Sequence, residues 1–342
     1  MFRFFGSVSP LGIDLGTSNV LVFHQGRVVM CESAVVAVNR NDNKISAIGE
    51  EARQMLGRTP GNIRAISPLQ EGVISNYSAA VGLMRRIINT HCGKGRMVHP
   101  NMALVLPCGA TGVEKRAVLD MAHDAGAGRA YPICAPVAAA IGAGLQVSLP
   151  QGNMIVDIGG GITDIGVVSL GGMVTSASAR IGGIHFDEFI SRYLRREYNL
   201  VINDGLAEEI KIRIGTADQW FEGDEVMEVR GRDLVNGMPR TVKMRAGEVR
   251  EAILEPLSLI AEKICGVLEE TPPELAADIM ENGITLTGGG ALLRGIDIFI
   301  TRRTGIKSII APDPISCAAI GAGKYIESVK KTEDEVESLE MA

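Results

Sequence analysis

The sequence predicts an α/β fold made of two similar halves. Strand-like apolar runs alternate with helix-like segments along most of its 342 residues, which is the order typical of α/β proteins. Two hairpin patterns, at residues 12–23 and 154–168, each place an aspartate near the end of an apolar run, just before a turn that contains glycine. This repetition indicates an internal duplication.

The second hairpin pattern has the more informative turn. Asp157 ends its first apolar run, glycines follow at 159–161, and the second apolar run begins after Asp164. Glycines let backbone N–H groups approach an anion closely, and a carboxylate beside them would repel phosphate unless a cation lay between. The pattern therefore suggests a Mg²⁺–nucleotide site, although this stretch alone would also suit a plain hairpin with a loose turn.

The first hairpin repeats this arrangement with Asp14 and the turn 16–19. A third glycine cluster, 288–290, follows the apolar run 284–286 and precedes what looks like the start of a helix at Ala291. Glycines at the entry to a helix suit an anion or a nucleotide ring packed against the backbone. We therefore expect each half to offer one phosphate loop to a shared nucleotide cleft.

The remaining pattern predicts the elements around these turns. Apolar residues at helical spacing indicate helices over 50–56, 78–89, 113–125, 136–145, 186–198, 206–214, 248–269, 272–280 and 315–329. Strands are expected over 28–30, 34–38, 102–106 and 131–133. A polar, β-rich stretch over 218–244 matches the small strand-rich stretch that follows the first hairpin, so each half has one small insertion.

Composition excludes several classes of protein. The net charge of −6, without a block of Lys or Arg, argues against general nucleic-acid binding. Six isolated cysteines indicate a reducing compartment, and neither a disulfide framework nor a zinc site. No apolar run has the roughly 20 residues that a membrane span needs. Phe2, Phe4 and Phe5 could lie in a membrane interface, form a loose end or pack on the domain.

An ordered series of motifs resembles one known family along nearly the whole chain. The motifs lie at residues 13–19, 55–61, 71–74, 113–117, 138–145, 156–161, 271–275 and 286–295. They are similar to those of MreB, the bacterial actin-like family of rod shape-determining proteins, within the actin/Hsp70/sugar-kinase superfamily. The resemblance implies an actin-like α/β fold, with two duplicated ribonuclease-H-like halves around a nucleotide cleft, each with a small inserted subdomain.

The resemblance also implies how the chain divides into subdomains. The expected boundaries are 1–31, 73–147 and 315–330 for subdomain IA, 32–72 for IB, 148–183 and 246–314 for IIA, 184–245 for IIB, and 331–342 for a flexible acidic tail.

Site roles follow from the resemblance, position by position, with ATP or ADP and Mg²⁺ as cofactors. Residues expected to bind the nucleotide are Gly16, Thr17, Ser18, Asn19, Gly159, Gly160, Gly161, Glu208, Lys211, Gly288, Gly289, Gly290 and Ala291. Asp14 and Asp157 would hold Mg²⁺ through water molecules. Glu208 and Lys211 would flank the adenosine, although their spacing also suits a solvated pair on one helix face.

Two residues depart from the family pattern. MreB-like sequences carry a glutamate that positions the attacking water where this chain has Ala135, and a threonine near the same water where it has Ile162. Neither side chain can accept a proton or orient water, so no catalytic residue is intact and weak or absent ATP hydrolysis is expected. Thr163 and Asp164 are the nearby polar residues that could keep residual activity.

The resemblance implies a protein that polymerises with itself into double filaments on the inner face of the cytoplasmic membrane. Its other expected partners are the cell-wall elongation machinery and a second MreB-like copy, with no nucleic acid. It would be cytoplasmic and peripheral on the membrane, anchored by Phe2, Phe4, Phe5 and a second apolar loop at Met97 and Val98. The alternatives are a sugar-kinase-type phosphotransferase and an Hsp70-like ATPase module, and pelleting on addition of ATP would favour the filament protein over both.

Overall fold

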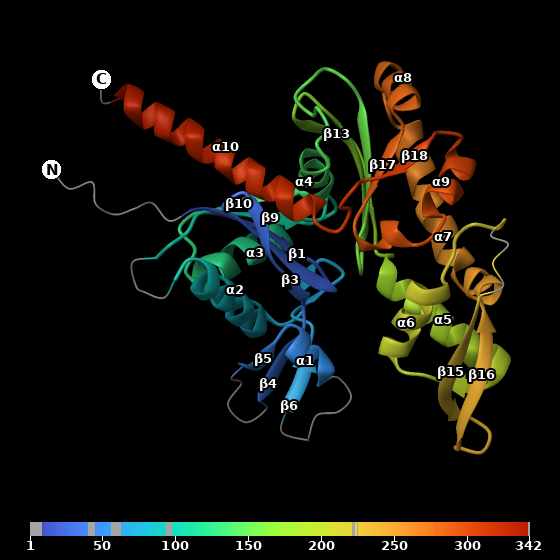
Figure 1. The fold of residues 1–342 in the computed structure, drawn as a ribbon. Helices are drawn as coiled ribbons and strands as arrows, with labels where there is room; N and C mark the ends of the chain where they lie inside the picture. The colour runs from blue at the N-terminus through green and yellow to red at the C-terminus, as the bar shows by residue number, and fades with distance from the viewer. Residues whose placement is uncertain are drawn as a thin grey trace. The chain divides into compact units, whose positions relative to one another are not determined.

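The chain divides into two compact units. The structure is a computed structural model that describes residues 9–39, 45–55, 63–93, 98–220, 223 and 225–340, with the backbone alone for 332–340. Unit 1 comprises Met1–Leu149, Leu170–Gly172 and Ile315–Ala342, and unit 2 comprises Pro150–Ser169 and Met173–Pro314. Figure 1 shows a central sheet with flanking helices in each of them.

Unit 1 is built on a five-stranded sheet. Its order is β10 (Ala130–Cys134), β9 (Met102–Leu106), β1 (Leu11–Leu15), β2 (Asn19–His24) and β3 (Arg27–Ser33). The first three strands are parallel to one another, and β2 and β3 continue as antiparallel neighbours. All five residues of β9 are buried, as expected for an apolar strand covered on both faces.

Four helices cover this sheet. They are α2 (Tyr77–His91), α3 (Gly112–Ala125), α4 (Ala135–Gly142) and α10 (Cys317–Glu340). Helices α4 and α10 pack against each other without intervening side chains, because a Cβ at Gly321 would be 1.7 Å from the Ala138 carbonyl oxygen. None of the helices in the described part of the chain is long and apolar enough to cross a membrane.

The small insertion of unit 1 carries the remaining elements. A three-stranded sheet has the order β5 (Ile45–Ile48), β4 (Val36–Asn39) and β6 (Ile63–Ile66). The short helix α1 (Glu50–Gln54) follows β5, and β7 (Leu69–Gln70) pairs with β8 (Val73–Ile74).

Unit 2 repeats the sheet of unit 1. Its order is β18 (Ser308–Ile310), β17 (Ile284–Thr287), β11 (Asn153–Ile158), β12 (Thr163–Ser169) and β13 (Gly172–Ala179). Three parallel strands are again followed by an antiparallel hairpin. The register is the same as well: Asp14 lies opposite Leu21 in β2, and Asp157 opposite Asp164 in β12. The predicted duplication is therefore confirmed.

The helices of unit 2 surround this sheet and its insertion. They are α5 (Gly183–Tyr198), α6 (Asp204–Ile214), α7 (Ala246–Glu269), α8 (Pro273–Asn282) and α9 (Ile296–Thr304), with the short 3₁₀ helix η1 (Gly289–Leu292). The insertion is the three-stranded sheet β14 (Leu200–Val201), β15 (Val226–Asp233) and β16 (Pro239–Arg245).

Three differences from the sequence-based expectations stand out. Strands β13 and β18 have no clear periodicity and were not predicted. The helix expected to start at Ala291 is a single 3₁₀ turn, and the α-helix begins only at Ile296. Helix α10 continues to Glu340, so its backbone extends into the segment expected as a flexible acidic tail, where several glutamates favour a helix.

Candidate functional site

The first glycine-containing turn, residues 16–19, joins β1 to β2 in unit 1. Gly16 has no room for a side chain, because a Cβ there would be 2.6 Å from the Asn19 carbonyl oxygen. The two central carbonyl oxygens are hydrogen-bonded within unit 1, from the Ser67 hydroxyl to Thr17 at 3.3 Å and from the Ala34 N–H to Ser18 at 2.8 Å. The turn is thus fixed from its carbonyl side.

The second turn, residues 159–162, joins β11 to β12 in unit 2. The Gly159 N–H donates to the Ile162 carbonyl oxygen at 2.8 Å, and a Cβ at Gly159 would be 2.9 Å from that oxygen. The first turn of α5 holds the carbonyl side, with hydrogen bonds from Gly183 N–H to Gly159 at 3.0 Å and from Ile184 N–H to Gly160 at 2.8 Å. This turn is fixed in the same way as the first.

Both turns leave the same backbone donors unused. Within the described residues, the N–H groups of Thr17 and Ser18 have no hydrogen-bond acceptor, and neither have those of Gly160 and Gly161. These pairs occupy equivalent positions after Asp14 and Asp157. Successive N–H groups without a partner form a concavity that suits an anion, so each unit presents one turn with this geometry.

The two aspartates lie next to these turns, near the carboxyl ends of their strands. Asp14 is beside Val105 of β9, and Asp157 is beside Thr287 of β17, whose hydroxyl donates to Asp157 Oδ1 at 2.9 Å. In the described residues no cluster of three or more His, Cys, Asp or Glu side chains could hold a metal ion. A magnesium ion at either carboxylate would therefore need water or phosphate oxygens as its other ligands.

The third glycine cluster packs directly on the end of β11. Gly288 has a φ of 80°, and a Cβ there would be 2.3 Å from the Ile158 carbonyl oxygen and 2.8 Å from Asp157 Oδ1. A Cβ at Gly290 would be 2.3 Å from Ile158 Cγ2, whereas one at Gly289 would meet nothing within 4 Å. The cluster therefore keeps its backbone close to Asp157 and exposes a bare backbone surface at Gly289.

Lys211 of α6 lies beside the second turn. Its Nζ donates to the Gly183 carbonyl oxygen at 2.8 Å and to Asp187 Oδ2 at 2.9 Å. Gly183 in turn donates its N–H to Gly159, so a short chain of hydrogen bonds links the ammonium group to the turn. The side chains of Lys211 and Asp187 are only 17% and 12% exposed, so Lys211 is not a solvated helix residue.

The Asp187 carboxylate pairs with Lys211 at a buried position, where its negative charge is unfavourable. Burial raises the pKa of Asp187 to about 6, against the lowering effect of Lys211, and the negative charges of Glu208 and Asp204 raise it further. Its Oδ1 is buried without a hydrogen-bond partner, although it lies 2.9 Å from Lys211 Nζ. The pair therefore holds Lys211 in place at an electrostatic cost.

The end of α6 is tied to the segment that follows the third cluster. Thr216 forms a β-bridge with Arg294, and the Ala217 N–H donates to the Arg294 carbonyl oxygen at 2.7 Å. A Cβ at Gly215 would be 3.1 Å from Leu293 Cδ1. In unit 2 the segment that follows α6 thus lies beside the segment that follows residues 288–291.

Ala135 lies in unit 1, at the same sheet edge as the first turn. It follows β10 directly, and the carboxyl ends of the parallel strands β1, β9 and β10 meet at one edge. The side chain is 5% exposed and begins α4. A methyl group occupies this place, with no atom that could orient water.

Ile162 closes the second turn in unit 2 with a half-buried aliphatic side chain. The next residue, Thr163, is fully buried and donates its hydroxyl hydrogen to the Ile181 carbonyl oxygen at 2.7 Å. Asp164 is 5% exposed. The polar groups that follow Ile162 therefore point into the protein.

Comparison with known proteins identifies the family. A family model described as MreB/Mbl protein matches residues 8–334. The cell shape-determining protein Mbl of Bacillus subtilis (strain 168) is 44% identical over 322 residues, covering 94% of this chain and 96% of its own. The cell shape-determining protein MreB of Escherichia coli (strain K12) is 46% identical over 329 residues, covering 94% of each chain. The chain belongs to the MreB/Mbl family.

Solved structures of similar proteins confirm the fold. MreB5 of Spiroplasma citri bound to ADP has a TM-score of 0.90 and 38% identity, and covers 95% of this chain and 98% of its own. The MamK double helical filament has a TM-score of 0.79 at 23% identity, covers 93% and 98%, and supports the fold alone. The predicted actin-like fold of this MreB/Mbl chain is thus confirmed.

Sequence analysis of this MreB/Mbl chain missed Asp187 and Gly183, the two residues that accept hydrogen bonds from Lys211. Asp187 follows the buried Phe186 on α5, and a carboxylate beside a core residue is a signal that its charge has a partner. Nothing in the spacing indicated that this partner is Lys211. The contact exists only because α5 and α6 pack together.

Of the residues expected to contact the membrane in this MreB/Mbl chain, the structure describes Val98. Phe2, Phe4, Phe5 and Met97 lie outside the described residues, and Val98 is half-buried in a loop before β9.

Proposed function

We propose that this chain is a nucleotide-binding protein that assembles into filaments and takes part in determining cell shape. The observation that carries the proposal is the pair of equivalent turns, each with two unused N–H groups beside an aspartate. Membership of the MreB/Mbl family supports it, because the relatives are cell shape-determining proteins and one was solved with ADP.

In this proposal one Mg²⁺–nucleotide is bound by both turns. Residues 16–19 and 159–161 bind the phosphates, and Asp14 and Asp157 hold Mg²⁺ through water molecules. Residues 288–291 pack against the base and sugar, for which the bare backbone at Gly289 leaves room. Glu208 and Lys211 flank the adenosine.

Hydrolysis is weak or absent in this proposal. Ala135 and Ile162 provide no group that orients or deprotonates a water molecule, and the Thr163 hydroxyl already donates to Ile181. Losing one such group costs about two to four orders of magnitude in rate. Binding and assembly would then respond to which nucleotide is present, with little turnover.

We further propose the family's subdomain boundaries and a peripheral location on the inner membrane face. Phe2, Phe4, Phe5, Met97 and Val98 are the proposed membrane contacts, and many weak anchors on one filament would bind together where one monomer would not. If deletion of residues 1–6 leaves co-sedimentation of filaments with liposomes unchanged, this anchor is wrong.

Three measurements on the same sample test the main proposal. Binding of a fluorescent ATP analogue, pelleting after addition of ATP and Mg²⁺, and release of phosphate are measured together on the purified full chain. We expect binding and pelleting, with phosphate release far below that of an ordinary MreB-like ATPase. Absence of any affinity for adenine nucleotides would refute the proposal.

A further inference from the structure

Helix α5 begins directly against the second glycine-containing turn. A Cβ at Gly182 would be 2.4 Å from the Gly159 carbonyl oxygen and 2.7 Å from that of Gly160. The N–H groups of Gly183 and Ile184 donate to the same two carbonyl oxygens. The position of the glycine turn therefore depends on the position of the first turn of α5.

Lys211 of α6 is bound to two successive turns of α5. Gly183 and Asp187 are four residues apart, so they lie on one face of that helix. The Lys211 Nζ donates to the Gly183 carbonyl oxygen at 2.8 Å and to Asp187 Oδ2 at 2.9 Å. Figure 1 shows α5 and α6 side by side, and the lysine side chain joins one helix to the other.

These contacts leave the lysine one donor for a ligand. A protonated lysine has three N–H groups, and α5 accepts hydrogen bonds from two of them. Asp187 Oδ1 is also 2.9 Å from Nζ, but it has no hydrogen-bond partner and so does not take the third. Because two of the N–H groups are held, the direction of the remaining one is fixed as well.

The pair of Asp187 and Lys211 is a costly way to join two helices. Both charges are taken out of water, and apolar side chains of similar size would stabilise such a contact as well or better. The unsatisfied Oδ1 of Asp187 adds to this cost. What the ion pair provides, and an apolar contact could not, is a charged donor at a fixed place.

The equivalent turn of unit 1 is held by neutral groups. The Ser67 hydroxyl and the Ala34 N–H bind the carbonyl oxygens of Thr17 and Ser18. The duplicated turn thus keeps its backbone conformation without a charged donor. Lys211 therefore serves unit 2 in another way than by holding the turn.

We infer that Asp187 is a positioning residue for nucleotide binding and that it acts through Lys211. Its carboxylate holds the ammonium group against Gly183, where the same turn of α5 fixes residues 159–161, and directs the remaining N–H to the adenosine. Asp187 itself does not touch the nucleotide. The inference rests on the proposed function and adds to it the residue that keeps Lys211 in place.

The positioning depends on the charge of Asp187. Burial raises the pKa of this carboxyl to about 6. Among the charged groups of α6 that face it, Lys211 lowers the pKa, while Glu208 and Asp204 raise it. As the pH falls below about 6, the carboxylate is protonated and no longer binds the ammonium group as an ion pair.

The other elements packed against α5 place their titratable groups elsewhere. On α7, Glu248 accepts a hydrogen bond from the Tyr198 hydroxyl, at the last residue of α5. Glu251 accepts one from the Tyr193 hydroxyl at 3.5 Å. Strand β14 and residues 159–162 contain no titratable side chain. On α5 itself, the His185 Nδ1 accepts a hydrogen bond from the backbone at the start of the helix.

The nucleotide affinity of Asp187→Asn tests the inference. Asparagine has nearly the same shape without the charge, so Lys211 loses its ion-pair partner. The dissociation constant of a fluorescent ATP analogue is measured with Mg²⁺ on the purified full chain at about pH 7.5. We expect it to rise about tenfold, which is the effect of losing one charge-assisted hydrogen bond. A circular dichroism spectrum like that of the wild type shows that the variant is folded.

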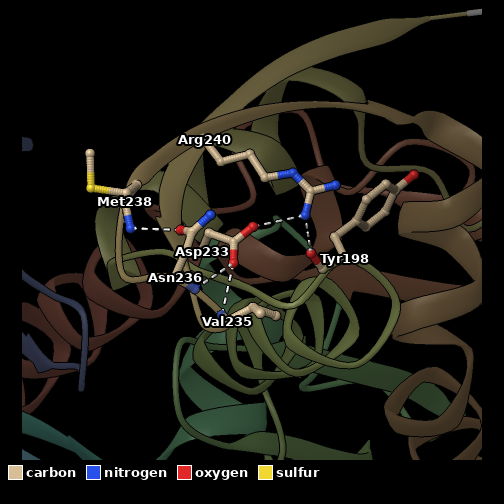
Figure 2. Close-up of polar contacts among 6 residues, drawn as sticks. All are labelled: Tyr198, Asp233, Val235, Asn236, Met238 and Arg240. Atoms are coloured by element: carbon tan, nitrogen blue, oxygen red, sulfur yellow. Dashed lines mark hydrogen bonds and ion pairs between the residues drawn. The ribbon is translucent and has the colours of Figure 1, made fainter.

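The matched control is Asp233→Asn, in the β15–β16 hairpin (Figure 2). Asp233 is likewise the acid of an ion pair in unit 2, with Arg240 at 3.0 Å. Arg240 also donates to the Tyr198 carbonyl oxygen at 3.1 Å, so this pair is tied to the end of α5 opposite the glycine turn. Losing it should leave the affinity for the ATP analogue as in the wild type.

A double-mutant cycle separates an effect through Lys211 from a general loosening of α5. Lys211→Gln removes the ammonium group and should itself weaken binding of the analogue. Adding Asp187→Asn to Lys211→Gln should change the dissociation constant by less than about twofold, because the group through which Asp187 acts is gone. An effect of about tenfold that persists in this background would overturn the inference.

The pH profile gives an independent test. The dissociation constant of Asp187→Asn relative to the wild type should be about tenfold higher near pH 7.5 and should approach the wild-type value near pH 5, where the wild-type carboxyl is protonated. Protonation of His185 and of the nucleotide phosphates is common to both proteins and cancels in the ratio. A ratio that does not change with pH would overturn the inference.

The outcomes separate the inference from the function on which it rests. If the wild type binds the analogue and Asp187→Asn binds it equally well at about pH 7.5, the positioning role is wrong and the nucleotide-binding function stands. If the wild type has no affinity for the analogue, the proposed function is wrong and the inference falls with it.

Discussion

Ala135 lies at the sheet edge of the first turn and Ile162 closes the second, and both side chains are aliphatic where the proposed nucleotide site would need polar groups for hydrolysis. We predict that the double substitution Ala135→Glu with Ile162→Thr raises phosphate release by about two orders of magnitude, because the carboxylate can take a proton from water and the hydroxyl can orient it. Single-turnover assays with ATP and Mg²⁺ measure this rate. Ala135→Gln with Ile162→Thr is the control of matched size, and it should gain far less. A wild type as fast as the double variant would contradict the prediction.

The Asp187 carboxyl provides a prediction on pH. Its pKa in the folded chain is about 6, above the ordinary 3.8, so the folded state binds more protons than the unfolded state between these values. The free energy of unfolding therefore falls as pH rises from about 4 to about 7, by on the order of 2 kcal/mol. Urea unfolding of the wild type and of Asp187→Asn at several pH values isolates this effect.

The difference between the two proteins is the informative quantity, because all other groups titrate in both. The stability of the wild type relative to Asp187→Asn should decrease as pH rises through 6. A difference in stability that stays constant or increases with pH would show that the folded chain does not raise the pKa of Asp187.

At the scale of elements, the contact between α4 and α10 depends on glycine. A Cβ at Gly321 would be 1.7 Å from the Ala138 carbonyl oxygen, a backbone atom that cannot move without shifting a helix. We predict that Gly321→Ala lowers the free energy of unfolding of the full chain by about 3 kcal/mol. Gly112→Ala, at a helix position where a Cβ meets nothing within 4 Å, should change it by less than about 0.5 kcal/mol. Thermal and urea unfolding compare the two, and equal effects would contradict close helix packing.

Sequence reasoning predicted the elements whose pattern is set by their own residues. The buried strand β9 is a continuous apolar run, and α3 has both helical periodicity and a capping box between Thr111 and Glu114. β13 was missed because its small and polar residues show no alternation of apolar and polar types. Its place at the edge of the sheet makes it a strand, with side chains that differ in exposure along its length. The start of α9 was placed five residues too early, at Ala291, because residues 289–292 form a 3₁₀ turn before the α-helix begins at Ile296.

At the scale of the whole molecule, the duplication was visible in the sequence because both copies keep an aspartate and a glycine turn at equivalent positions. The ion pair of Asp187 with Lys211 was not, because it joins two helices whose relative position no local pattern encodes.

The duplication also predicts how nucleotide binding stabilises the chain. A ligand bound only by the folded state raises the free energy of unfolding by about 2.7 kcal/mol at a hundred times its dissociation constant. If one nucleotide needs both turns, damage to either turn should remove the whole increase. Gly16→Ala would bring a Cβ within 2.6 Å of the Asn19 carbonyl oxygen, and Gly159→Ala within 2.9 Å of that of Ile162. Thermal unfolding of each variant with and without ATP and Mg²⁺ should therefore show no shift, while the wild type shifts upward. A shift that persists in one variant would mean that the turn altered in it does not contribute to binding, and that the two halves act separately.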